Sequence, residues 1–119
     1  MRDFRTLSVW EKAHRFTLSI YGMTGTFPKE EMFGLTSQLR RSCASIPANI
    51  AEGCGRSTDT DFARFLQIAF GSACEVEYLL FLANDLNYIS LSDHEKRNGD
   101  LIEIKKMLSA LISKLRANS

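Results

Sequence analysis

The 119-residue chain, 45% of it hydrophobic, is long enough for one domain with a modest core, and we expect residues 1–119 to fold as a single unit. Fifteen Lys and Arg residues against 14 Asp and Glu residues give a formal charge of +1, which excludes strong long-range attraction to nucleic acid or to an anionic membrane. The charge is uneven. Residues 1–56 hold eight basic and five acidic groups (+3), and residues 57–119 hold seven and nine (−2), so the first half is the better surface for nucleic acid.

The first predicted helix begins near Ser8, where Ser8 and Glu11 have the spacing of a capping box. Its outward face carries Lys12 and Arg15. Its apolar side is the series Trp10, Ala13, Thr17, Ile20 and Tyr21. The following connection, residues 25–34, contains two glycines and a proline, and we expect Phe27 and Phe33 to pack against the end of the bundle.

The second predicted helix runs from about Phe33 to Glu52 and ends at Gly53 or Gly55 in a left-handed conformation. Pro47 lies inside it and lacks the N–H that would bond to the carbonyl of Cys43. Either the helix is kinked at Pro47 but continuous, or it breaks and restarts with Ser45 near the cap. The unbroken apolar spacing favours the continuous, kinked helix.

Two faces with different chemistry share this second helix. Its apolar face comprises Leu35, Leu39, Cys43, Ile46, Ile50 and Cys54. A second, wholly polar face comprises Gln38, Ser42, Ser45, Asn49, Glu52 and Arg56. Small and amide-bearing side chains on this face suit close approach to another helix.

The third predicted helix follows Thr58 and Asp61, which again have capping-box spacing, and extends to about Asn87 as the longest of the set. Apolar residues surround much of it. One helix of a monomeric bundle can bury only one broad stripe, so a further apolar face needs a partner chain. We expect this oligomer interface to contain Phe70, Cys74, Tyr78 and Phe81.

The fourth predicted helix begins at the capping-box pair Ser92 and Glu95. Its apolar seam is Leu101, Ile104, Leu108, Leu111 and Leu115, and basic residues gather near its end, as the helix dipole favours. The four patterns together predict an all-α, up-down four-helix bundle with a long third helix.

Glu75 falls on a mostly apolar stripe of the third helix, where an unpaired buried carboxylate would be costly. Arg40 or Arg41 is the natural partner through a bidentate contact. One interpretation is a catalytic cluster of carboxylates, but an ordered structural network at a helix or protomer interface is preferred. Its members would be Gln38, Arg40, Arg41, Asn49, Glu52, Arg56 and Glu75.

Other signals for chemistry are weak. His14 and His94 have no second His or Cys at ligand spacing. Glu-x-x-His occurs once, at Glu11 and His14, whereas a di-iron bundle needs it on two helices, so we predict no metal and no cofactor. Cys43, Cys54 and Cys74 are odd in number and are interpreted as small buried hydrophobic residues. The start lacks a leader-like apolar core and no run of 18 apolar residues occurs, which predicts a soluble, cytoplasmic protein with no membrane segment. An enzyme is the third-ranked interpretation.

The runs SQLRRSCASIPANIAEGCGR and FARFLQIAFGSACEVEYLLFLANDLNYI resemble a known family. The members of this family are bacterial four-helix-bundle proteins encoded by intervening sequences within 23S ribosomal RNA genes. The similarity extends from Leu7 to about Leu115. The resemblance implies an up-down bundle that assembles as a homopentamer. A related accessory protein of diversity-generating retroelements binds nucleic acid and a reverse transcriptase, whereas the role of the intervening-sequence members is poorly defined.

Two functions therefore lead. The first is a self-assembling scaffold or interaction protein, five-fold by resemblance. The second is an RNA- or DNA-binding accessory module, or a partner of a nucleic-acid-processing protein, in which modest charge adds up around the ring. Its candidate contacts are Arg2, Arg5, Lys12 and Arg15, with Arg40, Arg41 and Arg56 as further basic groups.

Overall fold

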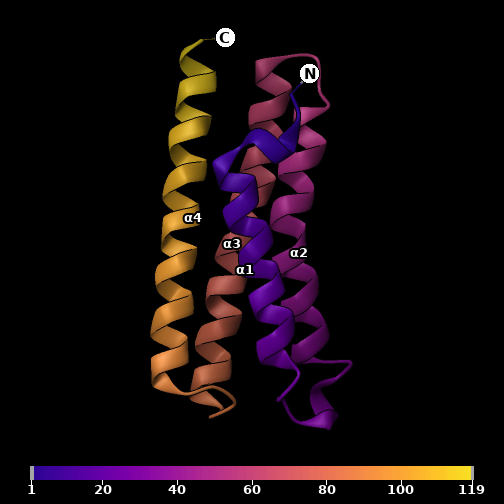
Figure 1. Ribbon diagram of the computed structural model, residues 1–119, viewed down its shortest axis with the longest axis vertical. Coiled ribbons are helices and arrows are strands. Elements are labelled where there is room, and N and C mark those ends of the chain that lie inside the picture. Colours follow the sequence, from indigo (N-terminus) through magenta and orange to yellow (C-terminus); the bar gives the residue numbers. More distant parts are fainter. Residues whose placement is uncertain (1, 119) are drawn as a thin grey trace.

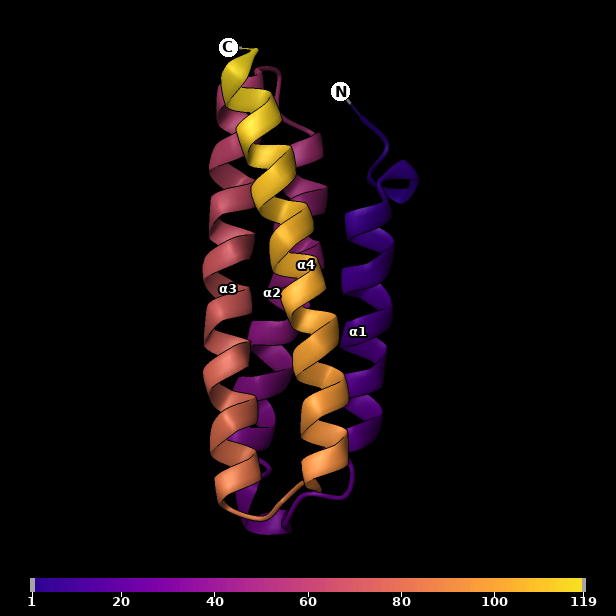
Figure 2. The same cartoon turned by 90° about the vertical axis from the view of Figure 1, so that its left-hand side faces the viewer.

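The structure, a computed structural model, describes residues 2–118 as four α-helices and two short 3₁₀-helices. In chain order these are η1 (Phe4–Thr6), α1 (Ser8–Thr24), η2 (Lys29–Glu31), α2 (Leu35–Cys54), α3 (Asp59–Asp85) and α4 (Leu91–Ala117). The four long helices run alternately down and up, side by side, in a bundle of 45 × 23 × 20 Å (Figures 1 and 2). The predicted all-α, up-down four-helix bundle is confirmed.

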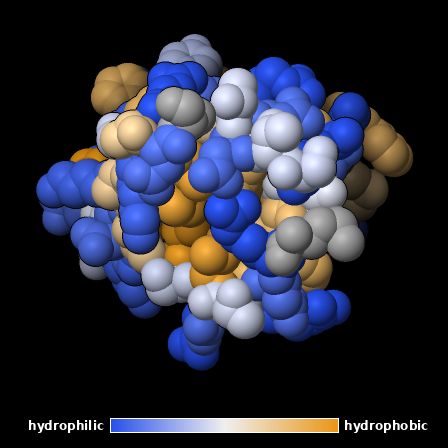
Figure 3. Space-filling view, turned by 90° about the horizontal axis from the view of Figure 1, so that it is seen from above, coloured by the Kyte–Doolittle hydropathy of each residue, from blue (hydrophilic) through white to orange (hydrophobic). Residues whose placement is uncertain are grey.

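One apolar stripe from each helix forms the core. Its fully buried members include Ile20, Leu39, Ile46, Ile50, Leu66, Leu80, Leu101, Ile104 and Leu108. Helix α2 packs most extensively on α3, followed by α3 on α4 and α1 on α2, and α1 and α4 have the smallest contact of the four neighbouring pairs. Hydrophilic side chains surround the end where α1 begins and α4 ends, and hydrophobic residues show in a hollow among them (Figure 3).

Helix α1 begins at Ser8 as predicted, but the capping box does not form. Leu7 is the N-cap, has no side-chain bond to the first turn, and accepts the Glu11 N–H on its carbonyl at 3.1 Å. Ser8 is thus already inside the first turn, and the Glu11 carboxylate pairs with Arg15. The helix starts one residue earlier than a Ser8 cap would require.

The connection between α1 and α2 departs from expectation at one aromatic residue. Phe27 is buried as predicted, but Phe33 is 93% exposed. The Glu31 carboxylate accepts hydrogen bonds from the Leu35 N–H at 3.1 Å and from the Tyr88 hydroxyl at 3.0 Å. These bonds fix the turn just before α2 in a form that leaves Phe33 outside the core.

Helix α2 stays continuous through Pro47, as the apolar spacing predicted. The carbonyl of Cys43, which Pro47 cannot bond, is approached by the Thr17 hydroxyl of α1 at 3.4 Å. The same hydroxyl lies 2.8 Å from the Ala13 carbonyl, so its single proton is shared between the two acceptors. A buried threonine on the neighbouring helix therefore partly compensates for the proline.

The end of α2 is not left-handed, contrary to the prediction. The C-cap Gly55 has φ −83°, and the last turn is closed by i→i+3 bonds, Gly55 N–H to the Glu52 carbonyl and Arg56 N–H to the Gly53 carbonyl. Gly53 has a packing role instead, because an added Cβ would come within 2.8 Å of Phe62 Cδ1 and 2.9 Å of Phe65 Cβ. It lets α2 and α3 approach closely.

Helices α3 and α4 each have 27 residues, so α3 is long but not the longest. Thr58 caps α3 by accepting the Asp61 N–H, as predicted. The cap of α4 is Ser90, which accepts the Asp93 N–H, and not Ser92. In the α4 seam, Ile112 is buried and Leu111 only half-buried.

Two of the three thiols are buried. Burial raises the pKa of Cys43 to about 12, although a hydrogen bond with Thr17 acts in the opposite direction, and burial also raises the pKa of Cys54. Cys74, however, is exposed on α3. The prediction of three buried cysteines is wrong for Cys74, because it lies on the outward side of a helix whose apolar residues extend beyond the core stripe.

Within residues 2–118, α3 is the single helix with the length and hydropathy of a membrane span, with a mean hydropathy of 1.4 over 18 residues. A core helix of a bundle reaches such values too, and α3 packs between α2 and α4. Yet only 39% of that window is buried. Much of the apolar surface of α3 therefore faces outward from the single chain.

Candidate functional site

The polar face of α2 meets α3 of the same chain. Ser45 and Ser72 are joined hydroxyl to hydroxyl at 2.9 Å, and the Asn49 amide donates to the Ser45 carbonyl at 2.8 Å and to the Ser45 hydroxyl at 2.9 Å. Small hydroxyl side chains at this contact permit the close approach predicted from the sequence. Along this part of the polar face, the helix that packs against α2 is therefore α3 of the same chain.

Glu75 does not form the expected arginine pair. It is exposed, and it accepts one hydrogen bond, from the Gln38 amide at 3.3 Å. Arg40 turns toward α1, where it donates to the Thr24 hydroxyl at 2.7 Å and the Tyr21 carbonyl at 3.2 Å and lies over the Tyr21 ring. Arg41 is exposed and makes no ion pair within the described residues. Water solvates Glu75 in the single chain, so it needs no buried cation.

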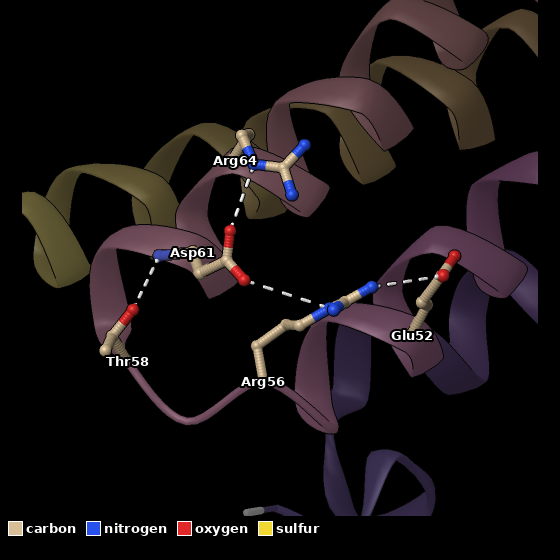
Figure 4. Close-up of polar contacts among 5 residues, drawn as sticks. All are labelled: Glu52, Arg56, Thr58, Asp61 and Arg64. Carbon is tan, nitrogen blue, oxygen red and sulfur yellow. Dashed lines mark hydrogen bonds and ion pairs between the residues drawn. The ribbon is translucent and has the colours of Figure 1, made fainter.

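Glu52 and Arg56 belong to a separate ionic network at the α2–α3 turn (Figure 4). Arg56 lies 3.3 Å from the Glu52 carboxylate and 3.9 Å from that of Asp61, which also pairs with Arg64 at 3.0 Å. Each pair is partly exposed and contributes little alone, typically about 0–1 kcal/mol. The predicted single network is thus divided into several local clusters. Glu52 and Arg56 belong to the cluster that stabilises the α2–α3 turn.

A groove of about 630 Å³ opens where α2 and α3 separate toward the α1–α2 connection. It is lined by Phe33, Gly34, Ser37, Gln38, Arg41, Ser42, Ser45, Ser72 and Glu75. We call these residues the α2–α3 edge. The edge combines an exposed aromatic ring with one unpaired cation and one solvated carboxylate, which is the composition of a contact surface and not of a catalytic centre.

The predicted interface residues lie together on the other side of α3, beside α4. Tyr78 is 61% and Phe81 54% exposed, Cys74 is exposed and Phe70 half-buried. A cavity of about 310 Å³ is lined here by Cys74, Glu77, Tyr78, Phe81, His94 and Asn98. We call this surface, with Phe70 and Lys105, the α3–α4 edge. More than half of Tyr78 and of Phe81 is exposed within the chain, although the His94 ring meets Phe81 edge-on with ring centres 6.4 Å apart.

Lys105 gives this edge a fixed charge pair, which the sequence reasoning missed. Its ammonium donates to the Glu77 carboxylate at 2.7 Å and lies 5.4 Å from the centre of the Phe70 ring. The hydrogen bond to Glu77 raises the pKa of Lys105, against the opposing effect of burial. Lys105 and Glu77 are 28 positions apart in the sequence. Their pairing can be predicted only when it is known that α3 and α4 are neighbours.

The candidate nucleic-acid contacts are largely neutralised. Arg2 pairs with Asp59 at 3.0 Å, Arg5 with Asp3 at 3.3 Å and Arg15 with Glu11 at 2.8 Å. Lys12 is half-buried and has no ion pair within the described residues. The positive field expected from these four residues is therefore much reduced by adjacent acids.

Aromatic rings accompany these basic groups. Trp10 stacks on His14 with ring centres 5.0 Å apart and planes 8° from parallel, and the Phe4 ring centre lies 4.8 Å from that of Trp10. The Arg5 guanidinium covers the Phe4 ring at 4.5 Å. The i, i+4 spacing of Trp10 and His14 is the signal in the sequence that could have found this stack.

No group of three or more His, Cys, Asp or Glu side chains within the described part of the chain is arranged to hold a metal ion. The site is instead a pair of unpartnered edges flanking α3, on a bundle of four antiparallel helices. These features define a small helical-bundle protein whose exposed surface, and not an internal pocket, carries the recognisable chemistry.

Comparison with known proteins places the chain within this class. Residues 5–110 match the 23S rRNA-intervening sequence protein family, and the chain belongs to that family. It is similar to a crystal structure of a protein of unknown function from the S23 ribosomal protein family of Bacteroides thetaiotaomicron VPI-5482. That structure has a TM-score of 0.81 and 33% identity over 88% of this chain and 95% of that one. No curated protein matches the chain.

Proposed function

We propose that the protein is a self-assembling scaffold, a homopentamer that presents repeated surfaces to a partner. The observation that carries this proposal is the outward side of α3. It exposes Ile68, Tyr78, Phe81 and Leu86 to between 43% and 61% in the single chain. Large apolar side chains left exposed on two sides of one helix are candidate interaction surfaces in a soluble protein.

Two unpartnered edges support a closed ring more than a two-fold dimer. A two-fold interface uses one self-complementary patch, whereas a ring requires two different patches that fit each other. The α2–α3 edge and the α3–α4 edge are two patches with different residues, as a ring would require. The number five rests on the resemblance to the family, since the geometry of one chain does not fix it.

Light scattering on the purified protein at micromolar concentration tests the assembly. We expect a mass near 67 kDa, five times the 13.4 kDa chain. A mass near 13.4 kDa would overturn the proposal, and another multiple would retain assembly while rejecting five-fold symmetry. Dilution series would show whether the assembly is stable or in exchange.

The alternative function is an RNA- or DNA-binding accessory module. The ring series of Phe4, Trp10 and His14 beside Arg5 favours it, because aromatic and basic groups together suit single-stranded nucleic acid. The ion pairs of Arg2, Arg5 and Arg15 weigh against it, since each offers a competing carboxylate. The scaffold ranks first for that reason. A nucleic acid or a nucleic-acid-processing protein remains the proposed class of partner.

A further inference from the structure

The two edges of α3 differ in shape and complement one another. We propose that successive copies meet edge to edge, with Phe33 of one copy inserted in the α3–α4 cavity of the next, so that every contact is heterologous. This inference rests on the proposed self-assembly and specifies which surfaces meet.

The α2–α3 edge and the α3–α4 edge face different directions around α3. Glu75 on the α2–α3 edge and Phe81 on the α3–α4 edge are six residues apart, which places them about 120° apart around α3. One copy can therefore contact two neighbours at once without the neighbours colliding. A single merged patch would have led to a pair instead of a ring.

The aromatic groups lie at matching heights. The bond between Ser45 and Ser72 sets these two residues level. Leu35 is ten residues, about 15 Å, below Ser45, and Phe81 is nine residues, about 14 Å, below Ser72. Phe33 lies two residues before Leu35, so copies related by rotation about an axis along the bundle bring it within about one helical turn of the neighbour's cavity.

Phe33 is suited to act as the inserted group. Its side chain is 93% exposed in the single chain, although the turn that bears it is fixed by Glu31 and Tyr88. The receiving cavity, about 310 Å³, offers the faces and edges of Tyr78, Phe81 and His94. Aromatic groups buried in such pockets are the usual anchors of protein interfaces.

The charges agree with the same register. The α2–α3 edge carries Arg41 and Glu75, and the α3–α4 edge carries Glu77 and Lys105 at the corresponding height. Arg41 can then face Glu77 of the neighbour while Glu75 faces its Lys105. Both contacts are between opposite charges, which favours this register.

Complementation between two broken edges tests the inference. Phe33→Asp removes the inserted group, and Phe81→Asp spoils the cavity. We expect each variant alone to shift from the wild-type mass to the 13.4 kDa monomer. Mixed in equal amounts, they should form a heterodimer of twice that mass, because the intact cavity of the first accepts the intact Phe33 of the second.

Controls separate assembly from folding. Leu18→Asp on α1 and Met32→Asp beside Phe33 replace side chains that are 59% and 55% exposed, and both should keep the wild-type mass. Circular dichroism should show unchanged helix content in every variant, and Tyr78→Asp replaces Phe81→Asp if the latter unfolds.

The failures are distinguishable. Wild-type mass retained by Phe33→Asp, or no heterodimer from the mixture, overturns the edge-to-edge contact while leaving self-assembly in place. A wild-type protein that is itself monomeric overturns both the contact and the proposed scaffold.

Discussion

Gly53 is the residue where helix packing is least tolerant. A Cβ at this position would lie 2.8 Å from Phe62 and 2.9 Å from the Cβ of Phe65, and the latter atom can shift only with the backbone of α3. We therefore expect Gly53→Ala to destabilise the bundle by about 1–3 kcal/mol through overpacking. Urea denaturation monitored by circular dichroism measures the change.

Gly99 provides the matched control. It lies in the interior of α4, is exposed, and a Cβ added there would meet no atom within 4 Å. Gly99→Ala should stabilise the protein by roughly 0.5–1 kcal/mol, because alanine has the higher helix propensity. Equal effects of the two substitutions would contradict the close approach of α2 and α3.

The cysteines predict a selective pattern of alkylation. Burial raises the pKa of Cys43 to about 12 and raises that of Cys54, so both remain protonated and shielded near pH 8. Cys74 is exposed in the single chain. In the monomeric variant Phe33→Asp we expect iodoacetamide to label Cys74 alone, by mass spectrometry of peptides. Denaturation should release all three, and labelling of Cys43 before unfolding would contradict its burial.

At the scale of a single helix, the interruption of α2 by Pro47 has a partner on α1. Thr17→Val removes the hydroxyl near the Cys43 carbonyl and should cost about 1–3 kcal/mol, since a buried acceptor loses its donor. In a Pro47→Ala background, the new N–H can bond to that carbonyl, so the cost should be smaller.

A double-mutant cycle measures this coupling. The bond from Thr17 to Ala13 is the same in both backgrounds, so its loss cancels. We expect a coupling free energy of about 0.5–1.5 kcal/mol. A value indistinguishable from zero would show that the 3.4 Å contact has no energetic role.

Periodicity predicted the helices well because it records which side of each helix is apolar. The continuity of α2 through Pro47 and the cap at Thr58 followed from local spacing. Local patterns were less reliable in predicting which of two nearby residues is the N-cap of a helix. Ser8 and Ser92 had capping-box spacing, but Leu7 and Ser90 occupy the cap positions, because chain entry into the bundle fixes where each helix starts.

Side-chain partners were harder to predict than elements. The assignment of Glu75 to an arginine assumed that it was buried, and helical spacing alone does not show whether a neighbouring helix covers a given stripe. In the structure Glu75 is exposed, and Arg40 is held by Thr24. We therefore expect Glu75→Ala to change the stability of a monomeric variant by no more than about 0.5 kcal/mol. The exposed state of Phe33 likewise depends on Tyr88, which is distant in the sequence.

For the whole molecule, salt dependence separates the scaffold from the nucleic-acid alternative. Lys12 is the one unpaired cation of the four candidates within the described residues, and a five-fold ring would present it five times. Counterion release then predicts a log–log salt slope of about −4 to −5 for duplex DNA. Fluorescence anisotropy with labelled RNA and DNA, performed on verified oligomer, measures it.

Substitution identifies the contact. Lys12→Gln should abolish salt-sensitive binding, whereas Leu18→Gln leaves every charge unchanged and tests for a general effect of the α1 surface. Absence of binding at about 50 mM salt would leave the scaffold as the sole leading function. An undiminished slope in Lys12→Gln would place the contact elsewhere on the chain.

The hydrogen bond between Tyr88 and Glu31 has a kinetic consequence. It ties the α3–α4 connection to the turn that bears Phe33, so the backbone of this turn is already ordered before the proposed docking of two copies. A preordered anchor loses less conformational entropy on docking, and such gains appear mainly as slower dissociation. Tyr88→Phe should therefore shorten the lifetime of the assembly while leaving both contacting edges chemically unchanged. Subunit exchange between differently labelled rings would report that lifetime directly.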